Sequence, residues 1–329
     1  WDEVCCEADQ CARVRCSHYS RCFFHRARRQ AARADILVVN HALLLSDLSL
    51  RLQTDNYSAT AVLPPFDRVI LDEAHHLEDV ATSYFSSHIT RFTFSRILNR
   101  LRHPRKPNQG LLPRLLDQLA QELPDTLDDL YRTIHGDIES LIMKRQALFD
   151  RSLDVLQRFG EDVCQHLNKT VSSKVEFKHR VLPAFIETPV WQQGCDEIEE
   201  LRTALNDLVA GIGNLFRSAE ALPENVADKV ASTLVDLRGI AGRLEGLSVE
   251  LGSFMAVAAN SCVWIEIKEG RIGRSKGLIT ALCQAPLEVA ESLNQALYQR
   301  FRTLVMTSAT LTVAGAFGYF HSRVGLDRV

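Results

Sequence analysis

Two adjacent acids, Asp72 and Glu73, directly follow the apolar run of residues 69–71. A short apolar run of this kind predicts a buried strand of a parallel sheet. Open α/β sheets carry their chemistry just beyond the carboxyl ends of such strands. Because carboxylates are costly to remove from water, acids at this place indicate a bound cation or a proton-transfer task.

Magnesium-assisted attack on a phosphate suits this pair of acids. Mg²⁺ keeps most of its waters and takes one or two carboxylates plus phosphate oxygens, so we expect Asp72 to hold the ion through its water shell. Glu73 could orient or deprotonate the water that attacks the phosphate. His75 could report the state of the phosphate to a neighbouring segment. The alternative is that Asp72 and Glu73 only cap the following helix, where acids favour the first turn.

Three cysteines near the beginning of the chain, Cys11, Cys16 and Cys22, have the spacing Cys-x4-Cys-x5-Cys. Structural zinc sites usually pair cysteines two to four residues apart, and thiols at wider intervals suit an iron–sulfur cluster at least as well. The spacing alone leaves a cluster, a zinc site with His18 or His25, and unliganded thiols as alternatives. The uneven spread of the nine cysteines favours a cytosolic metal or redox site over a disulfide scaffold.

A basic segment, residues 10–34, contains seven arginines and no acid. Arginines with aromatic residues between them could follow a phosphate backbone and stack on bases. The alternative is that this segment is the solvated face of a helix over residues 23–34. The arginines that we take as DNA-binding candidates are Arg26, Arg28 and Arg29.

Two further apolar runs predict strands that end in polar residues. Residues 35–39 lead into Asn40 and His41, and residues 303–306 lead into the segment Thr307, Ser308, Ala309 and Thr310. A helix is predicted over residues 42–52, between the first of these runs and the two acids. This order of elements implies part of a βαβ sheet.

A long helical block separates the strands. Between residues 77 and 254, apolar residues recur at steps of three and four, which is typical of amphipathic helices packed on one another. Residues 262–267 and 278–282 predict a β-hairpin, and a helix is expected over residues 286–300. The hairpin turn, residues 270–277, lacks the ending of a phosphate loop, and no helix follows it. We therefore expect the helical block to be an insertion within one α/β domain.

Composition sets wider limits. A chain of 329 residues with 46% hydrophobic residues and a net charge of −3 is ordinary for a globular protein of roughly two domains. The net charge does not argue for nucleic-acid binding, so local patches must. No run approaches the ~20 apolar residues of a membrane helix, so no membrane partner is expected. The first residue is Trp, and we expect an internal piece of a longer protein.

These motifs together resemble one family. Asp72-Glu73-Ala74-His75 is similar to the Walker B element of superfamily 2 helicases, and the cysteine spacing before Phe23-Phe24 is similar to that of their iron–sulfur branch, which includes XPD, DinG and YoaA. Residues 34–44 resemble the family segment between cluster and DEAH box. Residues 264–266, 285–287 and 307–312 resemble the return from the helical arch into the first helicase domain and its motif III.

The resemblance implies a fold and an activity. The fold is a P-loop NTPase-type α/β parallel sheet, a partial helicase domain 1, with a large all-helical arch insertion and a Cys-rich iron–sulfur segment. The activity is ATP-dependent 5′ to 3′ translocation on single-stranded and forked DNA, in DNA repair or replication stress, in the bacterial cytoplasm at the nucleoid. The implied domains are residues 1–24 (cluster), 25–80 (helicase domain 1 with the DEAH box), 81–258 (arch) and 259–329 (return to helicase domain 1).

The resemblance also assigns residue roles. Asp72 and Glu73 would serve Mg-ATP, with Glu73 as catalytic base, and His75 with motif III (residues 307–310) would couple hydrolysis to DNA movement. Cys11, Cys16 and Cys22 would hold a [4Fe–4S] cluster whose fourth ligand lies upstream. Further DNA-binding candidates are Asn40 and His41. Because the phosphate loop and second motor domain are expected outside the chain, it should be inactive alone. The alternative is a non-catalytic, zinc-stabilised nucleic-acid-binding adaptor.

Overall fold

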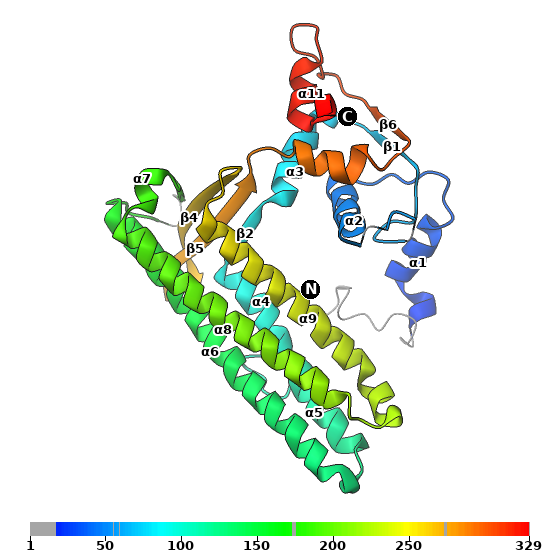
Figure 1. Ribbon diagram of the computed structural model, residues 1–329, viewed down its shortest axis with the longest axis vertical. Helices are drawn as coiled ribbons and strands as arrows, with labels where there is room; N and C mark the ends of the chain where they lie inside the picture. Colours follow the sequence, from blue (N-terminus) through cyan, green and yellow to red (C-terminus); the bar gives the residue numbers. More distant parts are fainter. Residues whose placement is uncertain (1–17, 55, 59, 173–175, 273–274, 329) are drawn as a thin grey trace. The chain divides into compact units, whose positions relative to one another are not determined.

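The computed structural model describes residues 18–54, 56–58, 60–172, 176–272 and 275–328 (Figure 1). Within this part the chain forms two compact units. The helical unit comprises Ser87–Ala258 and Val263–Cys283, and the α/β unit comprises residues 18–86, 259–262 and 284–328. The hairpin that the sequence analysis assigned to the α/β domain therefore belongs mostly to the helical unit.

Long helices dominate the helical unit. They form where the sequence shows stripes of apolar residues, and threonines begin two of them. Thr90 caps the first helix by accepting a hydrogen bond from the Phe92 amide, and Thr188 does the same for the Trp191 amide. The helices are α4 (Arg91–Leu101), α5 (Leu111–Glu122), α6 (Asp128–His166), α7 (Pro183–Ile186), α8 (Pro189–Ala219) and α9 (Glu224–Ala256).

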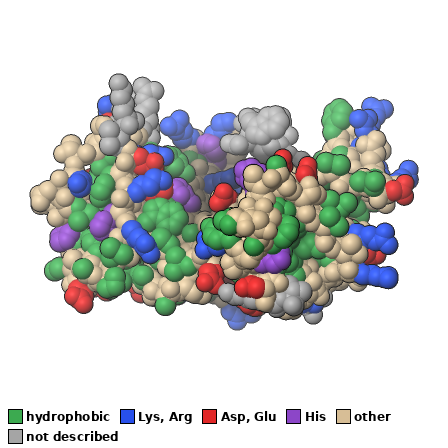
Figure 2. All heavy atoms as spheres, turned by 90° about the horizontal axis from the view of Figure 1, so that it is seen from above, with side chains coloured by type: hydrophobic (Ala, Val, Ile, Leu, Met, Phe, Trp, Pro, Cys, Tyr) green, Lys and Arg blue, Asp and Glu red, His purple; other side chains and the backbone are tan. Residues whose placement is uncertain are grey.

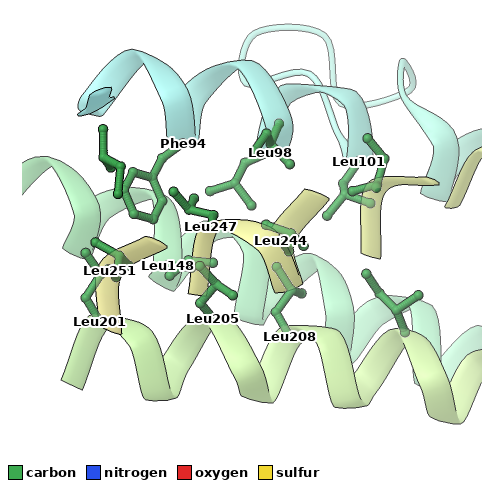
Figure 3. Packing of buried hydrophobic residues seen from close by; sticks show 14 of the residues in the cluster. Phe94, Leu98, Leu101, Leu148, Leu201, Leu205, Leu208, Leu244, Leu247 and Leu251 are labelled. Atoms are coloured by element: carbon green, nitrogen blue, oxygen red, sulfur yellow. The ribbon is translucent and has the colours of Figure 1, made fainter. Parts of the chain in front are cut away.

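The core of the helical unit lies between α4, α6, α8 and α9 (Figure 3). The side chains labelled in Figure 3 are leucines except for Phe94 and are fully or nearly fully buried, so each contributes about 1.5–3 kcal/mol of hydrophobic free energy. The predicted stripes are thus core residues. Figure 3 labels Phe94, Leu98, Leu101, Leu148, Leu201, Leu205, Leu208, Leu244, Leu247 and Leu251.

A four-stranded sheet accompanies these helices, so the prediction of an all-helical insertion is wrong. The strand order is β2-β5-β4-β3. β4 (Ser261–Ile272) and β5 (Ser275–Pro286) are the predicted hairpin, extended at both ends. β2 (Ser87–Thr90) and β3 (Phe177–Arg180) were missed because four residues are too few to display an alternating pattern.

One charged cluster lies on this sheet. β3 pairs antiparallel with β4, and Lys178 lies opposite Glu266. Burial alone would raise the pKa of Glu266, but hydrogen bonds from Lys178, Trp264 and His88 hold that pKa at about 2. The Glu266 side chain is therefore a carboxylate at neutral pH.

The α/β unit contains a parallel pair of strands, as predicted. β1 (Arg68–Leu71) pairs with β6 (Thr303–Met306), and Leu71 lies opposite Met306. The surrounding elements are short helices: α1 (Phe23–Ala31), α2 (His41–Thr54), α3 (Leu77–Phe85), α10 (Ala290–Leu293), a π-helical turn (Asn294–Tyr298) and α11 (Gly318–Val324), with 3₁₀ turns at Tyr19–Arg21, Ala74–His76 and Leu326–Arg328.

Two strand predictions in the α/β unit need correction. Residues 36–39 are extended but form no strand, and Ile36 and Val38 are 81% and 95% exposed. Without a neighbouring strand among the described residues, this segment gains no ladder hydrogen bonds. Its other side is only half-buried, where Val39 packs against the core of the α/β unit. β1 is buried on one face only, because Ile70 is 72% exposed while Val69 and Leu71 are buried.

A buried ion pair on α2 holds the loop that precedes β1. Asp47 and Arg51 are one helical turn apart, and the distance from Arg51 Nε to Asp47 Oδ2 is 2.5 Å. Their side chains are 0% and 1% exposed. The other Asp47 oxygen accepts a hydrogen bond from the Leu63 amide at 2.7 Å.

Arg51 also binds the loop backbone directly. Its guanidinium donates to the carbonyl oxygens of Tyr57, Leu63 and Pro64 at 2.7–3.0 Å, and it lies 5.0 Å from the ring centre of Phe66. We call the Asp47–Arg51 pair with these loop contacts the α2 clamp. The clamp fixes residues 57–66, and so fixes where β1 begins.

Across the described residues, the structure contains no helix that combines the length and apolarity needed to cross a membrane.

The α2 clamp leads to a prediction about stability. Asp47→Asn removes the carboxylate and leaves the Arg51 charge buried without its counter-ion, which should destabilise the α/β unit by about 3–5 kcal/mol. Hydrogen exchange of residues 57–71 should accelerate accordingly, since exchange reports local opening. The matched control is Asp67→Asn, which removes an exposed acid next to β1. Equal exchange in the two variants would contradict a clamp.

Candidate functional site

The carboxyl ends of β1 and β6 lie side by side. The ladder continues one step past both strands, because the Thr307 amide donates to the Leu71 carbonyl at 2.9 Å. The Ala74 amide then donates to the Thr307 carbonyl at 3.0 Å. These two bonds bring residues 72–73 next to residues 307–308, although 235 positions separate them in sequence.

Asp72 contacts the first hydroxyl of the second segment. Thr307 Oγ1 donates to Asp72 Oδ1 at 3.3 Å, and the same oxygen accepts the Glu73 amide at 3.0 Å. Asp72 is exposed, so its other oxygen faces solvent at the strand end. This arrangement suits a carboxylate that binds a hydrated cation.

Glu73, His75 and Ser308 form a closed triangle. His75 Nδ1 lies 2.7 Å from Ser308 Oγ and 3.2 Å from Glu73 Oε2, and Ser308 Oγ donates to Glu73 Oε2 at 3.3 Å. A consistent set has the imidazole donating to Ser308, and Ser308 donating to the carboxylate. The triangle connects the acid after β1 to the hydroxyl after β6.

Glu73 has an unusual backbone conformation. Its φ of +50° and ψ of +44° lie in the left-handed region, which residues other than glycine adopt rarely. Such strain costs about 1–3 kcal/mol and is concentrated at functional sites. The conformation turns the chain sharply after Asp72, so that both acids leave the strand at the edge of the sheet.

The alternative that these acids only cap the next helix does not fit the geometry. α3 begins at Leu77, and its N-cap is His76. Glu73 precedes the 3₁₀ turn Ala74–His76, but its side chain makes no capping hydrogen bond there. Its carboxylate is 58% exposed and contacts His75 and Ser308 instead.

The candidate DNA-binding arginines lie on α1, and exposed aromatic rings lie at the beginning of this helix. Phe23 is 80% exposed and Phe24 41% exposed. Two arginines are also anchored to backbone: Arg28 donates to the Ala61 carbonyl and Arg29 to the Ser20 carbonyl. Each arginine lies over an aromatic ring, with 5.4–5.6 Å from the guanidinium carbon to the ring centre: Arg26 over Phe23, Arg28 over Phe24 and Arg29 over Tyr19. We call these three pairs the α1 surface.

Charged and apolar side chains are mixed on the face of the molecule that Figure 2 shows, in line with the net charge of −3. The net charge therefore gives no argument for nucleic-acid binding, and only local sets such as the α1 surface can carry one.

Two other candidates, Asn40 and His41, lie at the beginning of α2. Asn40 Oδ1 accepts a hydrogen bond from the Leu43 amide at 2.8 Å, which caps the helix. His41 is the first residue of α2 and is half-buried. The structure thus gives Asn40 a capping contact that the sequence analysis did not foresee.

Only one predicted cluster ligand can be placed. Cys22 directly precedes α1 and is a half-buried free thiol. Cys11 and Cys16 lie outside the described residues. Cys22 thus lies at the start of α1, the helix that carries the arginines of the α1 surface.

The sequence analysis missed the residues that position β1. Asp47 and Arg51 hold the loop from which β1 starts. An acid and a base four positions apart in an otherwise leucine-rich helix were the available signal.

Comparison with known proteins finds similar sequences. Residues 6–94 match the family model DEAD_2. The chain is 26% identical over 99% of its length to a protein named 3'-5' exonuclease DinG from Bacillus subtilis, of which it covers 32%. It is 25% identical over 97% of its length to the ATP-dependent DNA helicase YoaA of Haemophilus influenzae, of which it covers 39%.

A shorter match has a higher sequence identity. Over 102 residues, 31% of this chain, it is 37% identical to the ATP-dependent helicase DinG of Mycobacterium tuberculosis, of which that segment covers 14%. The chain spans about a third to two fifths of the length of the relatives that match it throughout. The chain is thus similar to DEAD_2 proteins over residues 6–94 and to proteins named DinG and YoaA along nearly its whole length.

Proposed function

We propose that this chain is part of an ATP-dependent DNA helicase and carries half of its nucleotide site at the ends of β1 and β6. The observation that supports the proposal most is the convergence of two acids and two hydroxyls from strands far apart in sequence. Relatives along the whole chain include proteins named ATP-dependent DNA helicase. The phosphate loop, the second motor domain and the upstream cluster ligand would come from other parts of the protein.

The acids would act on Mg-ATP in different ways. Asp72, held by Thr307, would bind Mg²⁺ through the water shell of the ion. Glu73 would orient the attacking water and accept its proton, because its carboxylate is exposed at the edge where the γ-phosphate would lie. The His75 and Ser308 contacts hold the Glu73 carboxylate in one orientation, which is the positioning that phosphoryl transfer requires.

The same contacts could couple hydrolysis to movement. His75 follows β1, whereas Thr307, Ser308, Ala309 and Thr310 follow β6, and the Thr310 amide donates to Ser308 Oγ at 3.4 Å. A change at the Glu73 carboxylate would therefore reach the backbone after β6 through two hydrogen bonds. We propose that this path biases a conformational change in the DNA-bound motor.

Single-stranded and forked DNA are the proposed substrates, with translocation from 5′ to 3′. The α1 surface offers exposed aromatic rings for base stacking and guanidinium groups for phosphates. Asn40 and His41 at the start of α2 are further candidates for backbone contacts. A role in DNA repair or replication stress, in the bacterial cytoplasm at the nucleoid, belongs to this proposal.

A [4Fe–4S] cluster held by Cys11, Cys16 and Cys22 with an upstream ligand completes the proposal. Such a cluster would supply a rigid, thiolate-held element next to the DNA. Cys22 at the start of α1 would tie that element to the α1 surface.

The role of Glu73 can be tested in the intact protein. Glu73→Gln keeps the size of the side chain and removes its ability to accept a proton. ATP binding should persist, while DNA-stimulated hydrolysis should fall by a factor of about 10²–10⁴. Asp79→Asn, which neutralises an exposed acid on α3, is the matched control. Undiminished turnover in Glu73→Gln would remove the assigned role.

The α1 surface can be tested by the salt dependence of DNA binding. The slope of log K against log salt is negative, and each lost phosphate contact reduces its magnitude by about 0.7 for a single strand. Replacing Arg26, Arg28 and Arg29 with Gln should therefore reduce the magnitude of the slope by about 2. A control with the same charge loss replaces three exposed arginines of the helical unit, Arg132, Arg151 and Arg158. If both triple variants have equal slopes, the α1 surface is only a solvated helix face.

Iron analysis separates the helicase from the zinc-stabilised adaptor. Anaerobically purified intact protein should be brown and contain about four irons per chain, and Cys16→Ser should lose both the colour and the iron. Cys195→Ser, at a half-buried thiol of α8, should change neither. Colourless protein without iron would support the adaptor.

A further inference from the structure

Three side chains with metal-binding donor atoms meet on the sheet of the helical unit. His88 is on β2, Cys283 on β5 and Glu266 on β4, and these strands are consecutive in the sheet. One donor atom from each residue lies within 4.8 Å of the other two. Side chains on neighbouring strands come this close only when they share a face of the sheet.

The imidazole and the carboxylate already have the spacing of two ligands of one ion. His88 Nε2 lies 3.3 Å from Glu266 Oε2. Metal–ligand bonds of 2.0–2.3 Å in a tetrahedron place ligand atoms about 3.3–3.8 Å apart. The thiol sulfur of Cys283 lies within 4.8 Å of a donor atom of each of these two residues.

The second oxygen of Glu266 is fixed by other groups. Glu266 Oε1 accepts hydrogen bonds from Lys178 Nζ at 2.6 Å and from Trp264 Nε1 at 2.8 Å. Oε2 is thereby left facing His88. Metal-binding carboxylates and imidazoles are characteristically oriented by such outer partners.

A pocket of about 180 Å³ gives access to this face. Its lining includes His88, Glu266 and Lys268. Cys283 is fully buried and does not line the pocket, whereas the Glu266 side chain is 13% exposed and His88 is 54% exposed. An ion and a water molecule could therefore enter from solvent and reach His88 and Glu266, whose donor atoms lie within 4.8 Å of the thiol sulfur.

We propose that Cys283 Sγ, His88 Nε2 and Glu266 Oε2 bind a zinc ion, with a water molecule as the fourth ligand. A thiolate, an imidazole and a carboxylate are the three protein ligand types of zinc, whereas Mg²⁺ and Ca²⁺ take oxygen ligands. Cys283 binds as the thiolate, so its proton is released to water when the ion enters. The site is separate from Cys11, Cys16 and Cys22.

The ion would act as a cross-link. β2 is the first element of the helical unit, and β5 is the last. Zinc would join residues 88 and 283 through a bond that survives local opening of the sheet, and it would stabilise the folded helical unit by mass action.

Cobalt is the direct probe of the site. In the full chain, Ser would replace Cys5, Cys6, Cys11, Cys16 and Cys22, so that these thiols cannot bind the probe. Co²⁺ alone should then bind one ion per chain and give a thiolate-to-metal charge-transfer band with the intense visible bands of a tetrahedral site. Zn²⁺ should displace it. The band should disappear in Cys283→Ser.

A surface variant keeps the test independent of folding. His88→Ala changes an exposed side chain and should weaken Co²⁺ binding by at least about 10- to 100-fold, the effect seen when only outer partners of a metal site are lost. Zn²⁺ should raise the unfolding temperature of the parent chain and not that of His88→Ala. Cys262→Ser, a neighbouring thiol of β4 outside the trio, should bind Co²⁺ like the parent.

Two results would overturn the proposal. One is a parent chain without a thiolate band at saturating Co²⁺. The other is a band of unchanged strength and affinity in Cys283→Ser or His88→Ala, which would show that another thiol holds the ion.

Discussion

The α/β unit depends on one buried ion pair, Asp47 with Arg51. Removing each charge from water costs several kcal/mol, and the pair is tolerable only if its remaining polar atoms are satisfied. Here the loop backbone does this, since one amide and three carbonyl groups between Tyr57 and Pro64 bind the two side chains. The loop cannot leave α2 without leaving buried charge behind, and β1 starts four residues after the last of these contacts.

Beyond this clamp, a short backbone ladder holds the carboxyl ends of β1 and β6 together. β1 and β6 share four residue pairs, and two more backbone hydrogen bonds extend the ladder to Ala74. Those bonds hold Glu73 in a left-handed conformation that costs about 1–3 kcal/mol. The strain is maintained because relaxing it would break the Ala74–Thr307 bond and the Glu73–Ser308 contact together. The chain thus gives up some local stability to fix the position of the Glu73 carboxylate. The proposed role of Glu73, orienting a water molecule, would require such a fixed position.

The sequence was sufficient where a pattern is long or a residue type is unusual in its place. Leucine stripes predict α8 and α9, and acids or hydroxyls after apolar runs predict the convergence of β1 and β6. Short strands such as β2 and β3 carry no readable period. Residues 36–39 have the composition of a strand, but strand formation requires a partner that composition does not reveal. The spacing of Asp47 and Arg51 indicates only a possible ion pair within α2. Their hydrogen bonds to the loop backbone could not be predicted, because every residue type offers the same backbone groups.

The two faces of the sheet in the helical unit explain why polar groups gather on one of them. α6 lies directly on the other face, since a Cβ on Gly160 would be 2.0 Å from Thr280 Oγ1. Thr280 and Cys283 are three positions apart on β5, so they point to opposite faces. The face with Cys283 carries His88 and Glu266 at a pocket, with Lys178 bound to Glu266. Burial, together with the neighbouring Glu266 carboxylate, raises the pKa of the Cys283 thiol to about 12, so the thiol is neutral at neutral pH unless a cation binds it. Lys178 neutralises one oxygen of Glu266 only, and the other oxygen, the imidazole and the thiol are the groups that a zinc ion would satisfy together.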